Sequence, residues 1–268
     1  FGTGYTFDAA TRKFTLTGTI SQLTWKDNHD EIVAQNLYSC LETSCNVMYK
    51  VTGYINDTQM SVQPISYSSN SYEGTLKNTM DSVIKTKIDS WYESNLLNKE
   101  DGVGKKYSDY LADVTFCNDR SIASGSGYLT TPTTLYGVYK RLANHRTPSL
   151  KCSQNSDQFR VNNAAAALKY PISLITADEI ALAGGVYNTP NSNYYLYNGK
   201  YYWTLSPSSF HSYRSLANVW SVAVSGSLNP WADVAASDGV RPVLNLSSNV
   251  QITMGDGTSS NPFIVSIS

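Results

Sequence analysis

The sequence of 268 residues predicts a mixed α+β fold, and three observations lead to that class. Short segments in which apolar and polar residues alternate occupy residues 1–68. Helix signals replace them at 76–97 and around "LITADEIALAGG" at 174–185. From residue 194 onward the pattern returns to short strands. We therefore expect two helices set among antiparallel sheets, with long loops between them.

The first 68 residues are predicted to form a small all-β module that precedes a second domain at 69–268. "YTFDAATRKFTLTGTI" predicts one hairpin, because alternating residues follow a polar turn. "NLYSCLETSCNVMYKVTGYI" predicts a second hairpin. Pro64 in "MSVQPISYSS" argues that the next strand lies at an edge, since proline cannot donate to a ladder.

A long amphipathic helix is predicted over 76–97. Its apolar stripe comprises Met80, Val83, Ile84, Ile88, Trp91 and Tyr92. The residues expected to lie off that stripe are Lys85, Lys87, Asp89 and Glu93.

The second helix begins with a capping box formed by Thr176 and Glu179, and Gly184 and Gly185 end it. Asp178 and Glu179 resemble a catalytic carboxylate pair. The start of a helix explains both acids, however, because Glu179 caps and Asp178 favours the positive end of the helix dipole. The structural interpretation is preferred.

Composition narrows the function. The net charge is -1, and charged residues make up 15% of the chain, below the typical ~25%. No basic stripe is present for a phosphate backbone, so nucleic acid is not an expected partner. No run of 18 apolar residues occurs, so no membrane insertion is expected within this fragment. The start "FGTGYTF" suggests a mature or excised piece, with signal peptide and anchor outside it.

Four cysteines, an even number, lack the CxxC spacing of metal sites. We predict two disulfides, Cys40–Cys45 and Cys117–Cys152, and hence an oxidising compartment. Four cysteines allow three pairings, and four free buried thiols are the alternative. No metal or other cofactor is predicted, because Asp256 alone does not make a calcium site.

The order of "FCNDRS", "LITADEIALAGG", "YWTLSPSS", "NVWSVAVSGSL" and "DGVRPVLNL" resembles C-type-lectin-like domains of the formylglycine-generating-enzyme-like group. Within that group the chain is similar to a family found in surface and phage-associated proteins of Gram-positive bacteria. The resemblance covers about residues 69–268. It implies a C-type-lectin-like fold of two helices around twisted antiparallel sheets.

The resemblance also implies roles for particular residues. Arg241, in "DGVRPVLNL", would pack into the fold and bond backbone carbonyls of neighbouring loops, as a five-donor group can. The reactive cysteine pair of formylglycine-generating enzymes would lie near the C-terminal part of the fold. No cysteine follows Cys152, so that activity is not expected. The GxSxG, HExxH and P-loop motifs are also absent from the sequence.

A binding function is therefore predicted, on the loops at 206–219 and 225–239. The candidate ligand-binding residues mix aromatic and charged side chains, which is typical of contact surfaces: Phe210, His211, Tyr213, Arg214, Trp231 and Asp233. The alternative for the aromatic members is burial under long loops.

The sequence thus predicts a non-catalytic, extracellular module of a bacterial surface protein, adhesin- or lectin-like, that binds a glycan or a host cell-surface protein. Two alternatives remain. One is a structural spacer domain of a surface or phage fibre protein, with no ligand. The other is a secreted enzyme whose active site is not identified. The resemblance concerns the fold, and a fold does not by itself fix a function.

Overall fold

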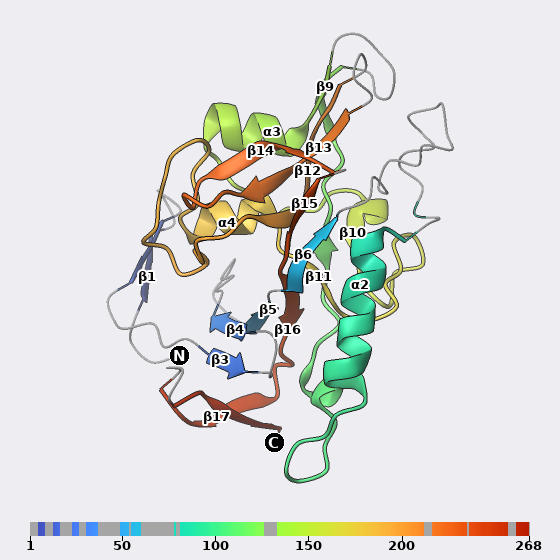
Figure 1. The fold of residues 1–268 in the computed structure, drawn as a ribbon, viewed down its shortest axis with the longest axis vertical. Helices are drawn as coiled ribbons and strands as arrows, with labels where there is room; N and C mark the ends of the chain where they lie inside the picture. The colour runs from blue at the N-terminus through green and yellow to red at the C-terminus, as the bar shows by residue number, and fades with distance from the viewer. Residues whose placement is uncertain are drawn as a thin grey trace.

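Antiparallel sheets interrupted by few helices make up the molecule, so the predicted α+β class is correct (Figure 1). The computed structural model describes part of the chain in full. Up to residue 59, and at 211 and 216, the description covers the backbone alone. The described residues are 5–8, 13–16, 23–26, 31–36, 49–53, 55–59, 78, 81–125, 133–211, 216–234, 236–256 and 261–267.

The larger sheet is built around strand β12 (Tyr202–His211). Its strand order is β14 (Leu228–Asp233), β13 (Leu216–Val222), β12, β15 (Ser237–Val240) and β6 (Ile55–Gln59). Strand β9 (Thr134–Tyr136) also pairs with β12, and β8 (Ile122–Ser124) pairs with β9. The predicted loops at 206–219 and 225–239 are therefore largely strand, which corrects the sequence-based expectation.

A second sheet has the order β11 (Ser173–Leu174), β16 (Pro242–Asn245), β5 (Tyr49–Gly53), β4 (Glu31–Asn36) and β3 (Leu23–Lys26). The first predicted hairpin of this segment forms, since β1 (Tyr5–Asp8) pairs with β2 (Lys13–Leu16). The second was expected within 36–55; β5 lies there, but its partner β4 precedes that stretch except for Asn36, and residues 37–48 lie outside the described part of the chain. Strands β5 and β6 also pair with β16 and β15, so the first segment contributes strands to both large sheets. The predicted boundary at 68–69 lies outside the described residues and stays a prediction.

Helix α2 (Val83–Tyr92) begins at Ser82, whose side chain accepts from the backbone N–H of Lys85, and continues as η1 (Glu93–Leu97). Ile84, Ile88 and Tyr92 are buried, as the stripe predicts. Two residues differ from the predicted stripe: Val83, expected on it, is 50% exposed, and Asp89, expected off it, is buried. A short turn, η2 (Tyr107–Tyr110), follows the helix.

The capping box at the second predicted helix forms as the sequence indicates. Helix α4 (Ala177–Ala183) begins after Thr176, which accepts from the Glu179 N–H while Glu179 accepts from the Thr176 N–H. Gly184 ends it at a φ of 120°. A third helical segment, α3 (Gly137–Tyr139) continued by η3 (Lys140–His145), was not expected from the sequence.

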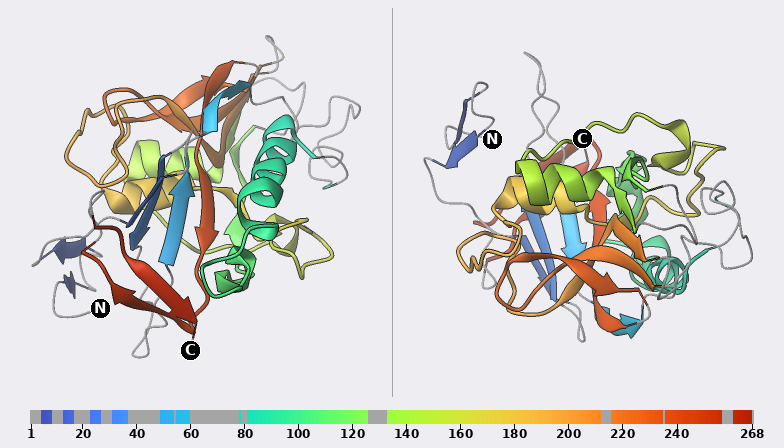
Figure 2. Two further views of the ribbon diagram at one scale, coloured as in Figure 1. Left: turned by 60° about the horizontal axis from the view of Figure 1, so that its bottom comes forward. Right: turned by 90° about the horizontal axis from the view of Figure 1, so that it is seen from above.

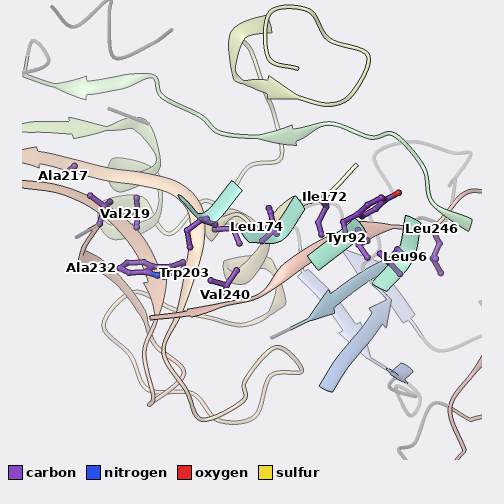
Figure 3. Packing of buried hydrophobic residues seen from close by; sticks show 14 of the residues in the cluster. Tyr92, Leu96, Ile172, Leu174, Trp203, Ala217, Val219, Ala232, Val240 and Leu246 are labelled. Carbon is purple, nitrogen blue, oxygen red and sulfur yellow. The ribbon is translucent and has the colours of Figure 1, made fainter. Parts of the chain in front are cut away.

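Two hydrophobic clusters lie on opposite faces of β12. Trp203 and Phe210 belong to the first cluster, together with Ile88 and Tyr92 from α2 (Figure 3). Tyr202 belongs to the second, which α3 and α4 cover (Figure 2). Because neighbouring strand residues point to opposite faces, Tyr202 and Trp203 enter different clusters. Strand β12 is therefore buried on both faces.

Arg241 lies at the edge of the second cluster and is 4% exposed. Its guanidinium donates to the Leu196 carbonyl and sits 4.6 Å from the centre of the Tyr202 ring. Burial raises the pKa of Tyr202, and the Arg241 charge opposes that rise. The arginine thus bonds a backbone carbonyl of a neighbouring loop, which is the role that the sequence suggested.

A disulfide joins Cys117 and Cys152, whose Cα atoms are 5.7 Å apart, so this prediction is confirmed. It supports the pairing of two very short strands, β7 (Phe116–Cys117) and β10 (Gln158–Phe159), next to η4 (Asn155–Asp157). Cys40 and Cys45 lie outside the described residues. At the C-terminal end, β17 (Val250–Met254) and β18 (Ile264–Ile267) form a hairpin.

A buried ion pair lies behind that disulfide. Arg120 Nε donates to Asp157 Oδ1 at 2.8 Å, and the Arg120 backbone N–H donates to Asp157 Oδ2. Other guanidinium nitrogens donate to the Ser156 carbonyl and to Asn78 Oδ1. Asp119, the neighbour of Arg120 in sequence, accepts from the Ser121 backbone N–H and from Arg141.

We expect Arg120→Met to lower the free energy of unfolding by about 3–5 kcal/mol, because the buried Asp157 carboxylate would lose its cation. Urea unfolding measures the change. Lys169→Met is the control, since it removes an exposed ion pair with Glu93 and should change stability little. Equal effects of the two substitutions would contradict the buried-pair account.

A pH dependence follows from Asp89. Burial raises the pKa of Asp89, although Lys85 opposes the shift. The stability that a raised pKa gives is present below the unfolded pKa and is lost as pH rises through the folded value. Asp89→Asn should therefore gain stability relative to the wild type as pH rises, in urea unfolding over a pH series.

Glu93 supplies the control of opposite sign. Hydrogen bonds from Lys169 and Tyr170 lower the pKa of Glu93, so its contribution is present above the unfolded pKa. Glu93→Gln should lose stability relative to the wild type as pH rises. The same trend for both variants would contradict the assigned environments.

Candidate functional site

The predicted binding residues fall into three groups. Phe210 is 2% exposed and belongs to the first hydrophobic cluster, so its side chain is not on the surface; this corrects the prediction. Trp231 is 46% exposed, and Asp233 is half-buried at the end of β14. The remaining residues, Tyr213, Arg214 and the side chain of His211, lie outside the described part of the chain.

Trp231 owes its exposure to its place in β14, which is the end strand of the larger sheet. Burial alternates along this strand, with Leu228, Pro230 and Ala232 buried. Trp231 points to the other side, as the period of two requires. Its backbone N–H donates to Asn229 Oδ1 at 3.1 Å, which holds the local conformation.

Three further aromatic residues form a chain of ring contacts that begins at Trp231. The Tyr139 ring lies 5.4 Å from the Trp231 ring and 6.1 Å from that of Trp220, centre to centre. The Tyr187 ring meets Trp220 at 6.0 Å with an interplanar angle of 82°. We call these four residues, Tyr139, Tyr187, Trp220 and Trp231, the aromatic face. Trp220 is fully buried behind the other three.

Polar atoms of the aromatic face are partly shielded from water. Burial raises the pKa of the Tyr139 phenol, and the neighbouring Tyr187 hydroxyl adds to the rise by charge and hydrogen bonding. Trp220 Nε1 is buried without a hydrogen-bond partner. The raised pKa keeps the Tyr139 phenol neutral at physiological pH, so this residue offers aromatic surface and a hydroxyl group rather than charge.

A polar loop borders the aromatic face. The Asn188 N–H donates to the Leu228 carbonyl at 3.1 Å, and the Asn191 N–H donates to the Ser225 carbonyl at 3.0 Å. Asn191 Nδ2 donates to the Gly184 carbonyl, which anchors the loop to the end of α4. These bonds hold residues 186–193 beside the turn between β13 and β14.

The two acidic side chains that resemble a catalytic pair, Asp178 and Glu179, form hydrogen bonds and an ion pair within the fold. Asp178 accepts two bonds from Arg141, at 2.9 and 2.7 Å, and one from the Ser149 N–H. Burial would lower the pKa of Arg141, but the hydrogen bonds and charges of Asp178 and Asp119 raise it overall. Glu179 closes the capping box. The dipole explanation for Asp178 is therefore incomplete, since a bidentate ion pair holds it.

Two searches complete the survey of the described residues. No group of three or more His, Cys, Asp or Glu side chains there could hold a metal ion. Within the same residues, no helix has both the length and the apolar character needed to cross a bilayer.

Comparison of the chain with protein-family models, with curated proteins and with solved structures finds no match.

Sequence reasoning found one exposed member of the aromatic face and missed its neighbours. Tyr139 and Tyr187 are distant from Trp231 in sequence, and no local pattern links them. They meet because helix α3 crosses the larger sheet and because the loop at 186–188 is bonded to Leu228. The one available signal was the low charge of the segments that carry Tyr187 and Trp231.

Gly226→Ala should disrupt the border of the aromatic face. Gly226 has a φ of +78°, and an added Cβ would lie 1.8 Å from the Asn191 carbonyl oxygen. Gly199→Ala is the matched control, because Gly199 has a φ of +71° but its nearest neighbour, Tyr197, is 3.6 Å away. We expect Gly199→Ala to cost about 1 kcal/mol and Gly226→Ala clearly more, in urea unfolding. Equal costs would mean that the turn and loop are not in close contact.

Proposed function

We propose that this chain is an extracellular, non-catalytic binding module of a bacterial surface protein. In this proposal it is an adhesin- or lectin-like domain, and its ligand is a glycan or a host cell-surface protein. The ligand binds on the aromatic face rather than on two long loops. The Cys117–Cys152 disulfide supports a location outside the cytoplasm, because such bonds persist in oxidising compartments.

The exposure of Trp231 carries the proposal. A tryptophan that is 46% exposed leaves apolar surface in water, at a free-energy cost that burial against a ligand would remove. The Tyr139 ring packs against the Trp231 ring, with 5.4 Å between the ring centres. This packing restrains the indole in an exposed position. Rigid aromatic side chains of this kind dominate the binding energy of many interfaces.

The C-type-lectin-like resemblance is part of the same proposal. The capped helix α4 and the buried Arg241 agree with the roles that the resemblance implies. The spacer alternative has an observation in its favour: the segment from Ser206 to Phe210, expected as a binding loop, is buried strand. A spacer domain would have no need of an exposed tryptophan packed against a neighbouring ring, as Trp231 is against Tyr139.

Trp231→Ala should weaken ligand binding while leaving the fold intact. The purified chain would be tested on an array of glycans and against a panel of extracellular proteins. Tyr201→Ala is the matched control, because Tyr201 is 45% exposed and lies beside β15, on the other side of β12 from β14. We expect a loss of about tenfold or more in affinity for Trp231→Ala and little change for the control.

Thermal unfolding of both variants would show that each is folded. A ligand that Trp231→Ala still binds with unchanged affinity would remove the site from the aromatic face. A chain that binds none of the glycans or proteins would favour the spacer.

A further inference from the structure

Two of the segments that border the aromatic face lack charge. Residues 184–199 and 217–232 contain no Asp, Glu, Lys, Arg or His. These segments lie side by side, because the backbone of 186–191 is hydrogen-bonded to that of 225–228. The face therefore has two uncharged segments along one border. Charged residues close to the face in sequence are Lys140 and Arg141, which follow Tyr139, and Asp233, which lies two residues after Trp231.

Hydroxyl and amide groups take the place of charges there. The exposed polar residues of the two segments are Asn188, Thr189, Ser192, Asn193, Asn198 and Ser225. Each of these side chains can both donate and accept hydrogen bonds. The border thus offers neutral groups of both kinds beside an apolar ring.

An uncharged polar border beside an exposed aromatic ring suits some classes of ligand better than others. A polyanion would need cations, which are absent from both segments. Protein interfaces draw much of their energy from arginine as well as from aromatic residues, and neither segment contains arginine. A neutral sugar fits better, because the C–H groups of a pyranose ring can pack on an indole while its hydroxyls exchange hydrogen bonds with amides and hydroxyls.

We infer that the aromatic face binds an uncharged carbohydrate, with one pyranose ring stacked on Trp231 and its hydroxyls toward the loop at 187–193. This inference rests on the proposed binding function and narrows it to one ligand class. The exposed polar residues of the loop would set the choice of sugar, and Trp231 would supply most of the affinity.

The test uses the full chain and soluble oligosaccharides. The neutral probes derive from cellulose, laminarin, chitin, starch and mannan, and the acidic probes are heparin, hyaluronan and polygalacturonate. Titration calorimetry at low and high salt gives affinities, and tryptophan fluorescence reports contact with the indole. We expect saturable binding of at least one neutral probe, unchanged by salt, because no ion pair forms.

Three variants locate the site. Trp231→Ala should lose about tenfold or more in affinity, whereas Trp231→Phe, which keeps a flat ring, should lose less. Tyr201→Ala should bind as the wild type does. Trp231→Phe also guards against the case in which Trp231→Ala fails to fold.

The outcomes separate the two proposals. Binding of acidic probes alone, weakened by salt, would overturn the neutral-sugar inference and leave a binding module. A protein ligand lost in Trp231→Ala, with no sugar bound, would do the same. Neutral-sugar binding that both Trp231 variants retain would overturn the site itself. Absence of binding to every sugar and protein would overturn both proposals.

Discussion

Burial of β12 on both faces is the constraint on which the rest of the fold depends. Tyr202 and Trp203 are consecutive, fully buried and directed into different clusters. Each face must be covered, by α3 and α4 on one side and by α2 on the other. Burying an aromatic side chain contributes about 1.5–3 kcal/mol to the stability of the fold. Removing the helices from either face would expose such side chains to water and lose that contribution. The positions of the helices, and hence of Tyr139 on α3, follow from this requirement.

Several polar groups in this double core are hydrogen-bonded within the fold, although Ser208 Oγ, Ser221 Oγ and Trp220 Nε1 are buried without a hydrogen-bond partner among the described residues. Thr204 Oγ1 donates to the Trp220 carbonyl, and Ser206 Oγ accepts from the Ala177 N–H at the start of α4. Two arginines are also paired: Arg120 and Arg141 face buried or half-buried carboxylates, at Asp157 and Asp178. Because an unpaired buried charge is expensive, these pairs fix how the loops around the core can lie.

The sequence predicted the elements whose signals are local. The capping box at Thr176 and Glu179 and the disulfide at Cys117 and Cys152 could be found because each depends on few residues. "LSPSSF" was misassigned as a loop, since serine and proline favour turns. In the structure its hydroxyls are buried, and Pro207 lies at a register shift of β12, where a missing N–H is tolerated.

The candidate binding site could be predicted only in part, for a related reason. Trp231 follows an Asn–Pro pair, which suggested a loop, whereas it lies in a strand at the end of a sheet. Its exposure was open to either interpretation from sequence. Its neighbours could not be found, because contact between Tyr139 and Trp231 depends on how α3 crosses the sheet. Long-range packing of this kind leaves no periodic signal in one sequence.

An exposed end strand such as β14 can meet a partner through its backbone or through its side chains, and the residues around Trp231 favour the side chains. Such a strand commonly invites another strand to pair with it. Pro230 has no N–H to donate, and the Trp231 N–H is taken by Asn229 Oδ1. Successive N–H groups point to opposite edges of a strand, so whichever of these two positions faces an incoming strand withholds its donor. The indole remains exposed while strand addition is opposed. A partner would therefore be recognised by the side chains of the aromatic face, and not by the backbone of β14.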